Sequence, residues 1–84
     1  MEVAYTCHMK MNKEAVSIKV GARIRAIRID KGLSMEKLAN DTGIEYSQLS
    51  RIELGKINTS IYHVYIIANS LKVPLHDLFD PLQR

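Results

Sequence analysis

Apolar residues recur at helical spacing along most of this chain. The first stripe has intervals of three and four residues, which places its members on one side of a helix; they are Val16, Val20, Ile24 and Ile27. The pair Lys31-Gly32 is typical of a helix end, because lysine is favoured near the last turn and glycine accepts the left-handed conformation. The pattern therefore predicts a first helix that begins near Glu14 and ends at this pair.

Two shorter helices are predicted next, separated by a tight turn. Ser34 is a good N-cap for a second helix over residues 35–40. Residues 41–43 include a glycine and break this helix. Ile44-Glu45 then leads into a third helix that ends at residue 53 or 54, just before Gly55.

Two further helices complete the pattern. Ser60 caps a fourth helix, and Pro74 precedes a short fifth helix over residues 75–79. The apolar stripe of the fourth helix consists of Ile61, Val64, Ile67 or Ala68, and Leu71. We therefore predict an all-α fold, a compact five-helix domain over residues 15–80, with a flexible N-terminal tail over residues 1–14 and a C-terminal tail over residues 81–84.

Length and composition restrict the classes to which the protein can belong. Eighty-four residues provide one hydrophobic core at most, and the hydrophobic (46%) and charged (25%) fractions are ordinary for a globular domain. No apolar run approaches the roughly 20 residues that cross a bilayer. A single cysteine excludes an internal disulfide and a cysteine-based zinc site. Since the N-terminus has no pattern of a secretory signal, we expect a cytoplasmic protein.

The sequence lacks the patterns of common catalytic and metal sites. Its three histidines, His8, His63 and His76, lie far apart, and it contains no phosphate-binding loop or nucleophile motif. We expect no enzymatic activity, no metal site and no cofactor.

Positive charge is concentrated in the first third of the chain. The net charge is +3, and residues 10–31 contain seven Lys or Arg against two acidic residues. This distribution permits a polyanionic partner, although a solvated helix face is an equally common reason for it.

The second and third predicted helices have the layout of a helix-turn-helix, whose second helix can lie in the major groove of DNA. A helix advances about 100° per residue, so a third helix that buries Leu49 and Ile52 turns its other side outward. That outward side is small, polar and carries one guanidinium; it consists of Ser47, Ser50, Arg51 and Leu54, flanked by Tyr46 and Gln48. It fits a groove about 12 Å wide, and the alternative is a solvated face of an ordinary helical bundle.

An ordered series of residues from Val20 to Phe79 resembles the lambda-repressor-like, Cro-type helix-turn-helix family of bacterial and phage DNA-binding proteins. The matching stretches are VGARIRAIRIDKGLSMEKLANDTGIEYSQLSRIELGKINTS and IIANSLKVPLHDLF. No single matching residue identifies the family by itself, but the ordered series with this spacing is specific for the fold. The resemblance implies a sequence-specific transcriptional regulator, a repressor, which binds double-stranded DNA as a homodimer.

The resemblance also implies which residues contact DNA. The family reads bases from the start and middle of the third helix, which here are Tyr46, Ser47 and Arg51, with Glu45, Gln48 and Ser50 as neighbours. Arg51 is a candidate for bidentate contact with guanine, and a phosphate contact is equally open.

Lys56 and Asn58 match positions at which the family grips the DNA backbone. Met35 replaces the glutamine that often begins the second helix, so backbone N–H groups at that helix end, beside Lys37, are left for phosphate.

The resemblance also implies one structural role. Arg28 and Glu53 match a partly buried ion pair that locks the motif. Because the chain ends soon after the fifth helix, a dimer would use the domain itself, with Leu78, Phe79 and Leu82 as candidate contacts unless they fold back on the core. Similar domains also occur as antitoxins, so a toxin partner is the alternative function, and no membrane partner is expected.

Overall fold

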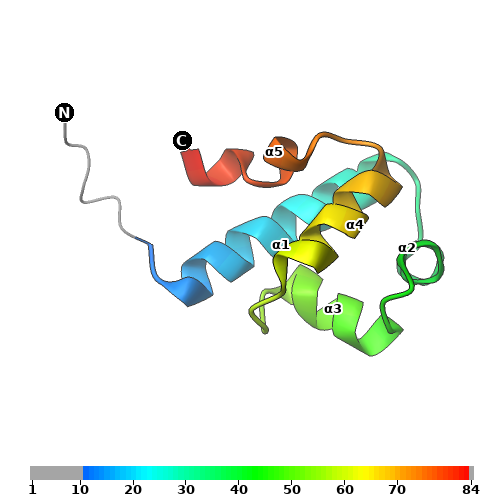
Figure 1. Ribbon diagram of the computed structural model, residues 1–84, viewed down its shortest axis with the longest axis horizontal. Helices are drawn as coiled ribbons and strands as arrows, with labels where there is room; N and C mark the ends of the chain where they lie inside the picture. The colour runs from blue at the N-terminus through cyan, green and yellow to red at the C-terminus, as the bar shows by residue number, and fades with distance from the viewer. Residues whose placement is uncertain (1–10, 84) are drawn as a thin grey trace.

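The computed structural model describes residues 11–83, which form five α-helices and a final 3-10 helix (Figure 1). No strand occurs among these residues, so the predicted all-α, five-helix fold is confirmed. The elements are α1 (Lys13–Asp30), α2 (Met35–Thr42), α3 (Tyr46–Leu54), α4 (Ile61–Leu71), α5 (Leu75–Leu78) and η2 (Asp80–Gln83).

Polar side chains fix where three of the helices begin. The side chain of Asn12 accepts a hydrogen bond from the backbone N–H of Ala15, and Ser34 and Ser60 cap α2 and α4 in the same way. Helix α1 therefore begins at Lys13 and includes the last two residues of the predicted tail, whereas residues 1–10 lie outside the described part of the chain.

Helix α2 is two residues longer than predicted. The hydroxyl of Thr42 donates to the carbonyl of Leu38 (2.9 Å), which satisfies this side chain inside the last turn. Gly43, at φ 77°, ends the helix in the left-handed conformation, and its N–H donates to the carbonyl of Ala39.

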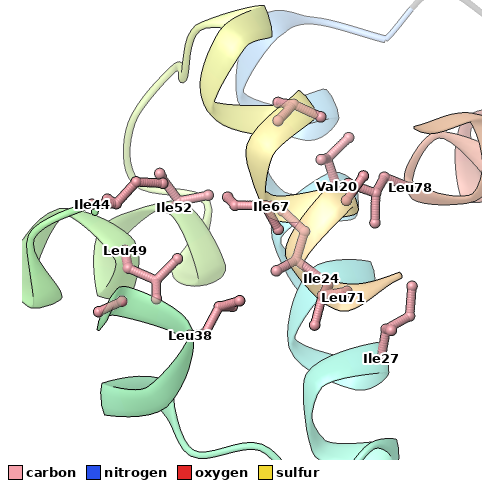
Figure 2. Close-up of a cluster of buried hydrophobic side chains, with 13 residues drawn as sticks. Val20, Ile24, Ile27, Leu38, Ile44, Leu49, Ile52, Ile67, Leu71 and Leu78 are labelled. Carbon is pink, nitrogen blue, oxygen red and sulfur yellow. The ribbon is translucent and has the colours of Figure 1, made fainter. Parts of the chain in front are cut away.

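The core lies between α1 and the other helices, and Figure 2 shows side chains from α1, α3 and α4 converging on it. The largest fully buried side chains are Ile24, Leu38, Leu49, Ile67, Leu71 and Leu78. The predicted stripe of α4 is wrong at Ile61, which is 80% exposed. The buried part of α4 begins only at Val64, so the first turn extends beyond the core.

The C-terminal segment folds back on the domain. Residues 80–83 form η2, which packs against α1, so the predicted C-terminal tail is wrong for residues 81–83. Leu78 is completely buried, and Phe79 and Leu82 pack against the same core. Leu78 is therefore not a surface contact for a second copy.

Arg23 of α1 holds this segment in place. Its guanidinium donates to the carboxylate and to the backbone carbonyl of Asp77, both at 3.1 Å. Over residues 11–83 no helix combines the length and the apolar character required to span a membrane.

Candidate nucleic-acid interface

Helices α2 and α3 and the turn between them form the predicted helix-turn-helix. Leu38 and Ala39 of α2 and Leu49 and Ile52 of α3 are buried, so the inner sides of both helices are fixed. In the turn, Ile44 is also buried, and its N–H donates to the Thr42 hydroxyl (3.3 Å). The angle between the two helices is therefore set by packing on both sides of the turn.

Helix α1 approaches the C-terminal end of α3 so closely that glycine is required on each side. A Cβ added at Gly21 of α1 would lie 2.2 Å from the carbonyl oxygen of Ile52. A Cβ added at Gly55, just after α3, would lie 2.5 Å from the Cα of Ile18. The backbones of α1 and α3 are therefore in direct contact, which fixes the C-terminal end of α3 against α1.

The predicted ion pair of Arg28 and Glu53 is present and forms a second connection between α1 and α3. Arg28 Nε donates to Glu53 Oε2 (2.7 Å), and Nη2 donates to Oε1 (3.1 Å). Arg28 Nη1 also donates to the carbonyl of Leu33 (2.8 Å), in the loop before α2. One buried guanidinium thus joins α1, α3 and the entry to α2, and the Glu53 side chain, 1% exposed, is not accessible to a ligand.

The outward side of α3 is accessible along its length. Tyr46 is 57% exposed, and Ser47 and Arg51 are also exposed, whereas Gln48 and Ser50 are half-buried. Within the described residues, the Arg51 side chain has no hydrogen-bond or ion-pair partner. Its guanidinium is therefore available to an external acceptor.

The start of α3 has a different character from its middle. A hollow between α2 and α3 contains the carboxylates of Glu36 and Glu45 and no basic side chain, and Tyr46 lies at its edge. These carboxylates would repel an anion such as a phosphate and are able to accept hydrogen bonds from a donor group. Glu36 was not among the predicted site residues, although its position in the first turn of α2 was visible in the sequence.

The predicted phosphate contacts fall into two groups. Lys56 and Asn58 are exposed in the loop after α3. Lys37 is exposed too, but its ammonium lies 3.1 Å from the carboxylate of Asp41. Met35 packs against the core, so its side chain is directed away from a ligand and only its backbone remains as a candidate.

Among residues 11–83 no three His, Cys, Asp or Glu side chains lie close enough together to hold a metal ion.

Known proteins are similar to this chain in both sequence and fold. A Rhodospirillum rubrum protein, named as an uncharacterized transcriptional regulator in the ATPase CF(0) region, is 35% identical over 69 residues, which cover 82% of this chain and 64% of that protein. The restriction-modification controller protein C.AhdI from Aeromonas hydrophila is 35% identical with a TM-score of 0.75, covering 77% of this chain and 98% of C.AhdI.

The structure of a third similar protein has been determined in complex with DNA. The controller protein C.Esp1396I, in a structure of its tetramer in complex with its natural 35 base-pair operator, is 29% identical with a TM-score of 0.73, covering 81% of this chain and 90% of that protein. The chain spans 64% of the length of the Rhodospirillum rubrum relative and 51% of the length of two rhizobial transcriptional regulators that it also matches. A profile of the helix-turn-helix domain matches residues 21–81, so the chain belongs to the helix-turn-helix domain family.

Proposed function

We propose that this protein is a sequence-specific DNA-binding transcriptional regulator, a repressor, which reads the major groove with α3 as a homodimer. One observation carries the proposal. Helix α3 is fixed on its inner side by burial, close backbone contact and the buried Arg28–Glu53 pair, while its outer side exposes Ser47 and an unpaired Arg51. A rigid helix with a free polar face suits direct readout, because base recognition needs donors held in place.

The charges around this face support separate roles for its residues. Arg51 lies between the carboxylates at the start of α3 and the exposed Lys56 after its end. We assign base contact to Arg51, with Tyr46 and Ser47 beside it, and phosphate contact to Lys56 and Asn58. Phosphate contacts would give affinity without sequence information, whereas Arg51 would supply discrimination.

Selection of bound sequences from random DNA duplexes tests the proposal. We expect wild type to enrich a motif of two half-sites about one DNA turn apart. Arg51→Ala should lose about 1–3 kcal/mol of discrimination at one base position and keep the others. Lys19→Ala, which removes an equal charge from α1 outside the helix-turn-helix, should enrich the wild-type motif.

Two results would contradict parts of this assignment. Uniform weakening in Arg51→Ala, with an unchanged motif, would make Arg51 a phosphate contact. Failure of wild type to enrich any motif would refute sequence-specific binding. Binding should also weaken as salt is added, because each neutralised phosphate releases counterions.

A further inference from the structure

An open hollow of about 470 Å³ lies where the C-terminal ends of α1 and α4 approach α2 (Figure 1). Three lysines from these three helix ends line it together with an apolar and a polar group; the lining includes Lys31, Leu33, Lys37, Asp41, Ser70 and Lys72. Of the described residues, none from α3 takes part. This hollow, here named the lysine hollow, is therefore separate from the face that we propose reads DNA.

The lining of the lysine hollow has an excess of positive charge. Its three lysines and one aspartate give a net charge of +2. Lys37 Nζ lies 3.1 Å from Asp41 Oδ1, so the one carboxylate is already engaged. Lys31 and Lys72 are exposed and have no ion-pair partner within residues 11–83. Because like charges repel, this arrangement favours an anion between the ammonium groups.

A buried hydroxyl in the same lining lacks a partner. Ser70 Oγ is buried and forms no hydrogen bond in the part of the chain that the structure describes. Buried polar groups are nearly always paired, and an unpaired one calls for a water, an ion or a ligand. Lysines offer donors only, so an acceptor for this hydroxyl must enter the hollow from outside, and rotation about one bond would direct the hydroxyl toward it.

The backbone of Lys72 is unusual. Lys72 ends α4 with φ 61°, and it is the one residue other than glycine with a positive φ among residues 11–83. A cation is favoured at a helix C-terminus, but the last turn of the helix provides that gain without a left-handed backbone. Glycine would fill this position at lower cost, and such costs occur most often at functional sites.

We propose that the lysine hollow binds the phosphate group of a small ligand, a phosphomonoester. Such a group carries a charge of about −1.5 to −2 near pH 7 and three acceptor oxygens, which match the net charge of the lining and the donors of Lys31, Lys72 and Ser70. Leu33 is half-buried in the same lining and would contact the organic part of the ligand. Small-molecule sites have volumes of roughly 300–1,000 Å³, so the hollow is large enough.

A titration followed by ¹H–¹⁵N NMR tests the site. The probes are inorganic phosphate and phenyl phosphate, each added at constant ionic strength. We expect saturable shifts of the amide resonances of residues 31–37 and 69–73, and smaller shifts in α3. Lys72→Gln and Lys31→Gln should each raise the dissociation constant about 3- to 10-fold, since each removes one charged donor. Lys19→Gln, an equal change on an exposed part of α1 outside the hollow, should match wild type.

Two variants distinguish ligand binding from a purely structural role. Asp41→Asn removes the carboxylate and frees Lys37, so it should lower the dissociation constant about 3-fold. Lys72→Gly should stabilise the free protein, because it relieves the left-handed backbone, and yet weaken phosphate binding as Lys72→Gln does. A lysine with only a structural role would leave the titration unchanged in both variants.

Three results would overturn the inference. Wild type may give no saturable shifts, or Lys72→Gln and Asp41→Asn may both titrate as Lys19→Gln does. The third result concerns the DNA backbone, whose phosphates share this chemistry: a selected duplex that displaces phenyl phosphate, with a smaller salt dependence of DNA binding in Lys31→Gln, would assign the hollow to DNA. The titration itself needs no DNA, so its failure would leave the proposed function intact, and a wild type that selects no motif would leave the phosphate site intact.

Discussion

Removal of Glu53 should strongly destabilise the domain, because it would leave the guanidinium of Arg28 buried without a counter-charge. The side chain of Glu53 is 1% exposed and that of Arg28 10%. In Glu53→Ala the two hydrogen bonds between them are lost, and only the carbonyl of Leu33 remains for Arg28. Breaking a buried pair on one side costs about 3–5 kcal/mol.

That loss is large for a protein of this size. Domains have about 0.05–0.15 kcal/mol of stability per residue, or about 4–13 kcal/mol for 84 residues. Each kcal/mol shifts the melting temperature of a small domain by about 4–8 °C, so Glu53→Ala should melt at least about 12 °C below wild type. Urea titration followed by far-UV circular dichroism gives the free energy directly, provided that the slope is unchanged.

Two further variants show whether burial is the cause. The Lys37–Asp41 pair has a similar separation of 3.1 Å, but its side chains are 60% and 36% exposed, so Asp41→Asn should cost less than about 1 kcal/mol. Replacing both buried partners, as in Arg28→Met with Glu53→Leu, should lower the free energy of unfolding less than Glu53→Ala alone does, since no uncompensated buried charge remains. A Glu53→Ala protein within about 1 kcal/mol of wild type would refute this reasoning.

Three further substitutions test other details of the packing. Gly21→Ala should lower the free energy of unfolding by about 2 kcal/mol or more in urea titration, because the new Cβ would lie 2.2 Å from the Ile52 carbonyl oxygen. A higher free energy of unfolding, as helix propensity alone would give, would contradict the close contact. Lys72→Gly should raise the unfolding free energy by about 1 kcal/mol, since Lys72 has φ 61°, and an unchanged value would argue against strain there. Leu78→Ala should lower the free energy of unfolding by about 2–5 kcal/mol and Leu75→Ala by much less, because Leu78 is fully buried and Leu75 is 37% exposed. Equal decreases in the melting temperature of the two variants would contradict this difference.

Much of the fold could be predicted because local signals and the core agree. The stripe of α1, the serine caps of α2 and α4, and the glycines after α2 and α3 all occur where the sequence predicted them. Each of these signals acts within one or two helical turns. The ion pair of Arg28 and Glu53 is different, because it joins residues 25 positions apart, and only the family resemblance indicated it.

Two errors in the prediction, at Ile61 and Leu78, concern residues whose environment is set by distant segments. Spacing places Ile61 on the stripe of α4, but spacing does not show that the core ends before the first turn of that helix. Leu78 was a candidate dimer contact because it stands near the end of the chain, whereas α5 folds back and buries it. The sequence shows that residues 61–71 contain no Asp, Glu, Lys or Arg, but the exposure of Tyr62 and Tyr65 depends on which side of α4 the core covers.

The loop between α3 and α4, residues 55–60, is fixed at both of its ends. Its start is fixed by Gly55, which meets the backbone of Ile18, and by the N–H of Lys56, which donates to the carbonyl of Arg51 (2.9 Å). Its end is fixed by the Ser60 hydroxyl, which accepts from the N–H of His63 (3.1 Å). The start of α4 is therefore held in a fixed position relative to the end of α3. The exposed Lys56 and Asn58 of this loop are thus held close to the end of α3, where we propose that they contact phosphate.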